Sequence, residues 1–192
     1  MRLFGYTLDK YGIPVAGATV ELKDAEFHTL YHVLSDESGY YEIEAEDKKY
    51  PFLIAVKEYA VKNLEFWCQN LDLTVDRQLD MRIDTLEVYG LHVFPVKGGR
   101  KALMVYFRPM SLSRFLMHEA DIAPGLKKVR TVLDGEVVQV LVTNEVKESI
   151  GDSCMTAYLI QIDNPGDSKW KRLDVEIWDQ DGHYGAATIF DN

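Results

Sequence analysis

The stretch GYTLDKYGIPVAGATVEL, residues 5–22, decides the fold that we expect for this chain. A short segment leads into a polar turn at Gly12, and in the segment that follows Ala18, Val20 and Leu22 alternate with polar residues. A period of two is typical of a β-strand that buries one face. The stretch therefore predicts two short strands joined by a turn.

Short strands follow one another through the rest of the first half. Residues 41–46 alternate between apolar residues and glutamates, and residues 50–56 form a nearly continuous apolar run. Residues 71–83 alternate again, with a slip of register at residues 77–78 that predicts a turn or bulge there. Ser, Asp and Gly between these segments favour turns. This spacing of short strands predicts an all-β sandwich.

The second half has the same character. Asp134 and Gly135 separate two apolar runs, which predicts a hairpin with a two-residue turn. The segment 111–122 is the one stretch whose pattern favours a short helix. No Gly/Ser-rich linker separates the two halves. We therefore expect two β-sandwiches in tandem, packed closely on each other, over residues 1–85 and 86–192.

Twelve positions of the first half share a pattern with a known family, and each has a structural reason, such as a glycine in a turn or an apolar residue facing the core. They are Gly5, Asp9, Gly12, Pro14, Val15, Gly17, Ala18, Val20, Asp36, Gly39, Tyr41 and Ile43. Over residues 1–85 the chain resembles the carboxypeptidase regulatory-like domain, a transthyretin-like (prealbumin-type) sandwich. Residues 86–192 are similar, in a generic way, to bacterial immunoglobulin-like modules.

The resemblance implies an accessory role, because in zinc carboxypeptidases this domain is an appendage to a separate catalytic domain. The metal site of that catalytic domain begins with H-x-x-E, and none of the five histidines here has Glu three positions later. The segments FHTLYH, 27–32, and DQDGHYG, 179–185, are interpreted as a strand face and a hairpin turn. We therefore predict no catalytic residues, no bound metal and no cofactor.

Composition and charge narrow the classes of partner. The formal net charge is −10, and a surface this acidic repels both nucleic acid and anionic lipid. No apolar run approaches the ~18 residues of a membrane span, and the first residues lack the apolar core of a signal peptide. We expect a cytoplasmic protein with no nucleic-acid or membrane partner, in which Cys68 and Cys154 are buried thiols.

Two tryptophans fall on the polar sides of their expected strands. In NLEFWCQN, residues 63–70, one side of the strand is apolar and the other carries a tryptophan with a carboxylate and an amide, and LDVEIWDQ, residues 173–180, has a similar arrangement. The candidate ligand-binding residues are Glu65, Trp67, Gln69, Asp174, Glu176 and Trp178. An indole beside such polar groups suits a sugar ring. It equally suits an interface between the sandwiches or between subunits.

Two classes of function follow. The first is a non-catalytic binding or accessory protein, which binds a carbohydrate, serves as a partner subunit of an enzyme, or associates with itself. The second is a small enzyme with an unrecognised site in the groove between the two sandwiches. The sequence contains no nucleophile elbow, P-loop or dinucleotide fingerprint, which favours the first class.

Overall fold

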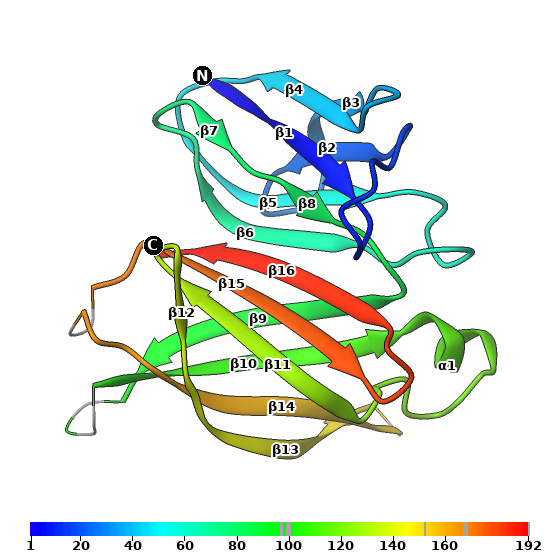
Figure 1. Cartoon of the computed structure of the whole chain (residues 1–192), viewed down its shortest axis with the longest axis vertical. Helices are drawn as coiled ribbons and strands as arrows, with labels where there is room; N and C mark the ends of the chain where they lie inside the picture. The colour runs from blue at the N-terminus through cyan, green and yellow to red at the C-terminus, as the bar shows by residue number, and fades with distance from the viewer. Residues whose placement is uncertain (97, 99–100, 152, 167–168, 192) are drawn as a thin grey trace.

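The computed structural model describes residues 1–96, 98, 101–151, 153–166 and 169–191 (Figure 1). Within that part of the chain β-strands form nearly all of the regular structure, and the single helix, α1, spans Leu112–Leu116. The strands form sheets that pack face to face in two lobes (Figure 1). The prediction of an all-β sandwich fold is confirmed.

The first lobe contains eight strands that form one complete sheet and half of another. A four-stranded sheet has the order β4-β1-β7, with β8 also paired to β1, and it covers strands β2, β3, β5 and β6. The bounds are β1 Arg2–Leu8, β2 Thr19–Lys23, β3 Thr29–Leu34, β4 Tyr40–Glu44, β5 Lys49–Val56, β6 Phe66–Asp72, β7 Arg77–Gln78 and β8 Met81–Arg82.

The second lobe also contains eight strands. A four-stranded sheet of order β13-β14-β10-β9 packs against strands β11, β12, β15 and β16. The bounds are β9 Leu86–Pro95, β10 Ala102–Ser111, β11 Leu126–Leu133, β12 Glu136–Val138, β13 Val140–Ile150, β14 Ser153–Asp163, β15 Arg172–Asp179 and β16 Tyr184–Phe190.

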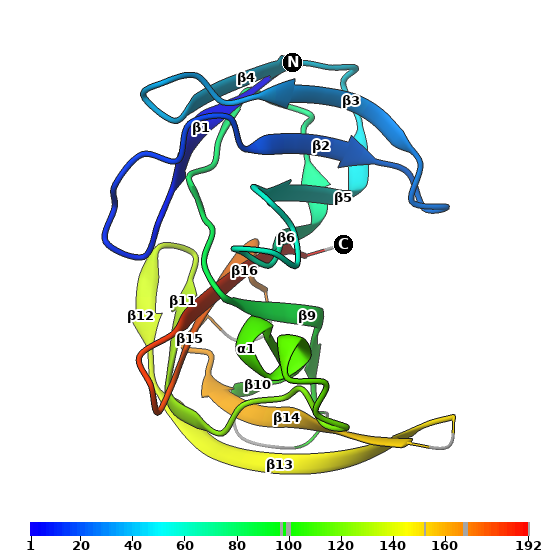
Figure 2. The same ribbon diagram turned by 90° about the vertical axis from the view of Figure 1, so that its right-hand side faces the viewer.

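One eight-stranded sheet runs through both lobes, in the order β12-β11-β15-β16-β6-β5-β2-β3. The lobes join where β16 pairs in parallel with β6, with Ala187 opposite Trp67 and Ile189 opposite Gln69. Figure 2 shows β3, β2, β5, β6 and β16 following one another down the molecule. The lobes are therefore tied together by main-chain hydrogen bonds as well as by side-chain packing.

The two hydrophobic cores lie on opposite faces of this shared sheet. We call the side that carries Phe66 and Cys68 the first face, because the core of the first lobe covers it. The side that carries Trp67 and Ile54 is the second face, and there the core of the second lobe begins. Strand β16 lies where the two cores overlap, and all seven of its residues are buried.

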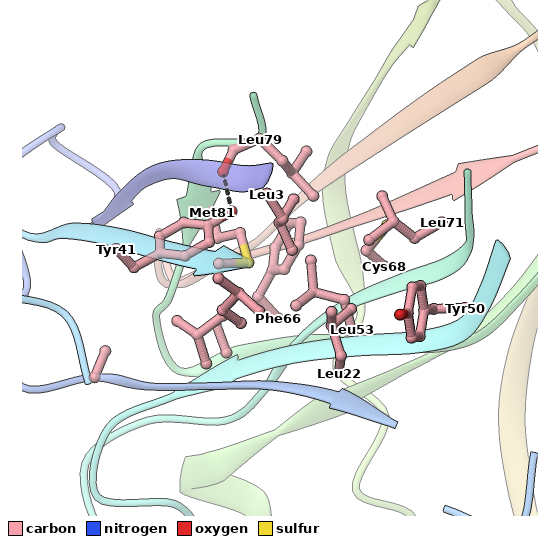
Figure 3. Packing of buried hydrophobic residues seen from close by; sticks show 14 of the residues in the cluster. Leu3, Leu22, Tyr41, Tyr50, Leu53, Phe66, Cys68, Leu71, Leu79 and Met81 are labelled. Carbon is pink, nitrogen blue, oxygen red and sulfur yellow. Dashed lines mark hydrogen bonds between the residues drawn. The ribbon is translucent and has the colours of Figure 1, made fainter. Parts of the chain in front are cut away.

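The first core draws its residues from six of the eight strands of its lobe and from β16. Figure 3 shows its centre, where the Tyr41 hydroxyl donates a hydrogen bond of 2.6 Å to the main-chain carbonyl of Leu79. Tyr184, Ala186 and Phe190 of β16 also belong to this core. The end of the chain thus completes the core that its beginning starts, and the division into separate domains at residue 85 stays a prediction.

Strands β9 and β16 approach each other closely where the second lobe meets the first. A Cβ on Gly185 would lie 2.5 Å from the main-chain oxygen of Leu86, nearer than real Cβ contacts allow. Only glycine therefore permits this approach, which brings β9 beside the sheet junction (Figure 2). Tyr89 and His92 of β9 are carried to the same place.

Three local predictions need correction or refinement. The segment Arg77–Gln78 is a short strand, parallel to β1, and not a turn. Cys154 is exposed, whereas Cys68 is buried as expected. The helix is confined to five residues, and Ser111 at its N-cap position makes no capping hydrogen bond with its side chain. No helix among the described residues is long and apolar enough to cross a membrane.

Candidate functional site

The structure divides the six predicted ligand-binding residues into two groups on opposite faces of the shared sheet. Glu65, Trp67 and Gln69 lie together on the second face and line one pocket of about 600 Å³. Asp174, Glu176 and Trp178 lie on the first face of β15. The two groups therefore cannot contact one small ligand at the same time.

The pocket beside Trp67, which we call the junction pocket, has a floor and two walls that come from distant parts of the sequence. Its floor is the second face of β5 and β6, one wall is the segment 24–28 between β2 and β3, and another is formed by β9 and β10. Besides the three predicted residues, seven others line the pocket: Ala25, Phe27, Phe52, Tyr89, Gly90, His92 and Arg108.

Three aromatic rings pack around the Trp67 indole, which makes a cluster of four. Phe27 stacks on the indole, with 5.4 Å between ring centroids and 22° between ring planes. Phe52 and Tyr89 meet the indole edge-on, at 6.0 Å and 5.5 Å. Trp67 is 9% exposed, whereas Phe27 is 43% exposed. The aromatic surface that a ligand could reach is therefore contributed more by Phe27 than by Trp67.

A buried carboxyl group lies behind the indole. Glu87 of β9 is 2% exposed and accepts a hydrogen bond of 2.8 Å from the Trp67 Nε1–H and a longer one, 3.4 Å, from the Glu65 main-chain N–H. Two effects raise the pKa of Glu87 to about 7: its burial, which is the larger, and the nearby charge of Glu65. Burial also raises the pKa of Glu65, which lines the pocket itself.

The cationic side of the junction pocket comes from β10. The Arg108 guanidinium lies 5.1 Å from the centroid of the Tyr89 ring, within the range of a cation–π contact. Its Nε is 3.5 Å from the Glu148 carboxylate. The pocket thus combines aromatic rings with a carboxylate, an amide and a guanidinium, a set that can both accept and donate hydrogen bonds.

The residues around Trp178 are engaged with one another. Asp174 accepts hydrogen bonds from Thr188, at 2.6 Å, and from the Arg172 guanidinium. Glu176 accepts hydrogen bonds from the guanidinium of Arg130 and from the hydroxyl of Tyr184. These acids are already paired, and a ligand would have to compete with those partners.

Trp178 itself is part of the protein's packing. Its ring meets Tyr184 edge-on at 5.2 Å, and the Lys128 ammonium lies 4.5 Å from its centroid. It packs against the first core as a half-buried side chain. The inward alternation of Leu173, Val175 and Ile177 agrees with their complete burial. A ligand-binding role for any of the six residues stays a prediction.

One group of side chains among the described residues has donor atoms close enough to hold a metal ion: Asp179, Asp181 and His183. Asp179 uses one carboxylate oxygen to accept the main-chain N–H groups of Asp181 and His183, and its other oxygen lies 2.7 Å from His183 Nδ1. A hairpin turn thus accounts for this arrangement. His28 lies in a similar turn, 3.2 Å from Asp24, so the interpretation of FHTLYH as a strand face is wrong for Phe27 and His28 and holds only from Thr29 onward. The absence of a metal stays a prediction at both places.

Sequence reasoning missed most of the junction pocket. Phe27 lies in a turn, where strand alternation says nothing about direction, and Tyr89, His92 and Arg108 come from the other lobe. One signal was present in the sequence. The segment DAEFH, 24–28, has the spacing of the turns DKYGI, 9–13, and DESGY, 36–40, with phenylalanine at the place of their glycine.

Comparison with known proteins finds no family model that matches this chain and no match among curated proteins. Among solved structures, a candidate carbohydrate-binding protein from Bacteroides uniformis is similar over 99% of this chain and 98% of its own, with 13% identity and a TM-score of 0.36. A DUF3823 family protein from Bacteroides ovatus is similar over 98% of each chain, with 11% identity and a TM-score of 0.32.

The major pilin subunit BcpA of Bacillus cereus is a further similar structure, over 98% of this chain and 67% of its own, with 11% identity and a TM-score of 0.32. Similarities this low carry no weight for function. The likeness of residues 1–85 to the carboxypeptidase regulatory-like domain stays at the level of the β-sandwich. The junction pocket alone therefore supports the function proposed below.

Proposed function

We propose that this protein is a non-catalytic binding protein whose ligand site is the junction pocket and whose ligand is a carbohydrate. The observation that carries the proposal is the meeting of four aromatic rings with Glu65, Gln69 and Arg108 in one open pocket. Most binding pockets combine apolar walls with a few polar groups that fix the ligand's orientation.

The chemistry of this pocket matches that of a sugar ring. A pyranose presents C–H groups on one face, which pack on an aromatic ring, and hydroxyl groups around its edge. The Glu65 carboxylate and the Gln69 carbonyl can accept hydrogen bonds from such hydroxyls, and Arg108 can donate to them. A purely apolar ligand would leave these polar groups without partners, at a cost in binding free energy.

Binding without hydrolysis is favoured over the alternative of a small enzyme in this groove. Glycoside hydrolysis ordinarily needs two carboxyl groups, one on each side of the bond to be cleaved. Among the residues that line the junction pocket, all of which lie in the described part of the chain, Glu65 is the one carboxylate. Of the acids that contact its lining side chains, Glu87 is buried behind the indole and Glu148 is paired with Arg108, at 3.5 Å.

The predictions of a protein partner and of a cytoplasmic location do not depend on the junction pocket. Association with a protein partner or with a second copy stays a prediction, which analytical ultracentrifugation and a pull-down from the native cell would test. The cytoplasmic location also stays a prediction, which cell fractionation would test.

The experiment is calorimetric titration of the purified protein with cellotetraose, xylotetraose, mannotetraose and maltotetraose. We expect at least one to bind, and Gln69→Ala and Glu65→Gln to weaken that binding about tenfold. The matched controls are Gln78→Ala and Glu44→Gln, at exposed positions in β7 and β4. Wild-type protein that binds none of the four, or site variants that bind as the controls do, would contradict the proposal.

A further inference from the structure

Four turns in this protein share one hydrogen-bonding pattern, although they lie far apart in the sequence. They are residues 9–13, 24–28, 36–40 and 179–183, and each begins with aspartate. In each turn the aspartate N–H donates to the carbonyl of the fifth residue, and the N–H of the fourth residue donates back to the aspartate carbonyl. The aspartate carboxylate also accepts the N–H of the fifth residue in all four.

The fourth residue of each turn has a left-handed backbone conformation. It is glycine in three turns, with φ of 82° at Gly12, 76° at Gly39 and 81° at Gly182. In the turn 24–28 it is Phe27, with φ of 67°. Glycine adopts this conformation freely, but a bulky side chain does so only under strain. The turn that borders the junction pocket is therefore the one in which the pattern's usual glycine is replaced at a cost.

The strained position directs the ring into the junction pocket. Phe27 stacks on Trp67 and meets Phe52 edge-on, at 5.7 Å between centroids. The Lys23 ammonium lies 4.6 Å from the centroid of the same ring and is held by Glu21, at 2.9 Å. Even with these neighbours, 43% of Phe27 stays exposed, at the wall of the pocket.

Strain of this kind is retained where the surroundings or the function require it. A glycine at position 27 would form the same turn without strain but would remove a ring from the pocket wall. Phe27 is 43% exposed and lines the junction pocket, so a ligand there can reach it. Phe27 lines the same pocket as Gln69 and Glu65, the polar groups that we assign to the sugar's hydroxyls.

We propose that Phe27 is the aromatic residue on which the ligand packs, and that the turn 24–28 keeps it in a strained conformation for binding and not for stability. This assignment rests on the proposed function, because it names the contact surface of the same carbohydrate site. It makes the turn between β2 and β3 a specificity-determining element, whose fourth residue sets whether the pocket has an aromatic wall.

The test compares Phe27→Gly, Phe27→Ala and Phe27→Tyr, with the four tetrasaccharides above as probes. We expect Phe27→Gly and Phe27→Ala to bind the positive probe about tenfold more weakly or worse, and Phe27→Tyr to bind within about twofold of wild type. We also expect Phe27→Gly to melt about 2–4 °C above Phe27→Ala, because glycine relieves the strain that alanine keeps.

Gly12→Ala is the matched control, because position 12 is equivalent in the pattern and a Cβ there would meet nothing within 4 Å. It should lower Tm by about 2–4 °C and leave binding unchanged. If wild type binds and Phe27→Gly binds equally well, the assignment of Phe27 is wrong while the proposed function stands. If Phe27→Gly melts about 10 °C or more below wild type, the ring is a structural cover for Trp67, and the assignment is also wrong. If wild type binds no probe, the proposed function fails and the assignment with it.

Discussion

The indole N–H of Trp67 donates a hydrogen bond of 2.8 Å to the carboxylate of Glu87, and this bond connects strand β6 of the first lobe with strand β9 of the second. Both side chains are almost completely buried. The contact fixes the floor of the junction pocket to its wall. The position of the pocket's aromatic rings relative to β9 therefore depends on this pair.

Trp67→Phe keeps an aromatic ring but removes the donor to Glu87. A buried carboxyl group left without its donor costs about 1–3 kcal/mol, so we expect the free energy of unfolding to fall by about 2 kcal/mol or more. Trp178→Phe is the control, because the Trp178 ring N–H makes no hydrogen bond within the described part of the chain, and its loss should be smaller. Urea unfolding measures both. Equal losses in the two variants would show that the hydrogen bond contributes nothing beyond ring size.

The same pair should make stability depend on pH. The pKa of Glu87 is about 7 in the folded protein, above the 4.5 that is usual for glutamate, so the folded state holds its proton more tightly. Stability is then greatest below about pH 4.5 for this group and is lost as the pH rises through about 7. Between pH 5 and pH 8 we expect a loss on the order of 2 kcal/mol from Glu87.

Glu87→Gln removes this titration while keeping a carbonyl oxygen that can accept from Trp67. Urea unfolding at pH 5 and pH 8 should therefore show a smaller loss in the variant than in wild type. Burial raises the pKa of Glu65 as well, so some loss of the same sign should stay in the variant. An identical pH dependence in both proteins would be inconsistent with a raised pKa at Glu87.

The crossing of β9 and β16 should tolerate no side chain at residue 185. A Cβ on Gly185 would lie 2.5 Å from the Leu86 carbonyl oxygen, so Gly185→Ala must push the two strands apart. We expect a loss of about 1–3 kcal/mol in the free energy of unfolding, as for other overpacked sites. Gly125→Ala is the control, because a Cβ there would meet nothing within 4 Å. Equal stability of the two variants would mean that β9 lies too far from β16 for a Cβ at residue 185 to meet the Leu86 carbonyl oxygen.

Because β16 completes the first core, the two lobes should unfold together. Tyr184, Ala186 and Phe190 pack among residues 3–83 of the first core, and β16 pairs directly with β6. We expect differential scanning calorimetry to show one transition whose calorimetric and van't Hoff enthalpies agree. Two resolved transitions would instead support the tandem domains 1–85 and 86–192 as independent units.

Strand alternation predicted which side chains share a face, because the period of two is a property of each strand alone. It placed Leu173, Val175 and Ile177 inward, and they are fully buried. It also placed Trp67 opposite Phe66 and Cys68, as the cores require. What covers a face depends on strands far away in sequence. The side of β6 interpreted as polar is therefore occupied by β9 and the second core.

The parts of the pocket that escaped prediction have the same cause. Tyr89 and Arg108 reach the pocket only because β9 and β10 pass beside the sheet junction, a contact that no local pattern encodes. Phe27 could have been found, since its turn departs from a pattern that recurs three times with glycine. The exposure of Cys154 could not have been predicted. This residue lies near the end of the long β13–β14 hairpin, where the alternation of side chains does not indicate which of them are buried.

The central claim is that a carbohydrate occupies the junction pocket, and the indole N–H signals of the three tryptophans test it most directly. In ¹⁵N-labelled protein, Trp67→Phe and Trp178→Phe identify two of these signals, and the third belongs to Trp170. On titration with the tetrasaccharide that binds in calorimetry, we expect the Trp67 signal to shift and the Trp178 and Trp170 signals to stay in place. A shift confined to Trp178, or binding heat with no shift at Trp67, would contradict the claim.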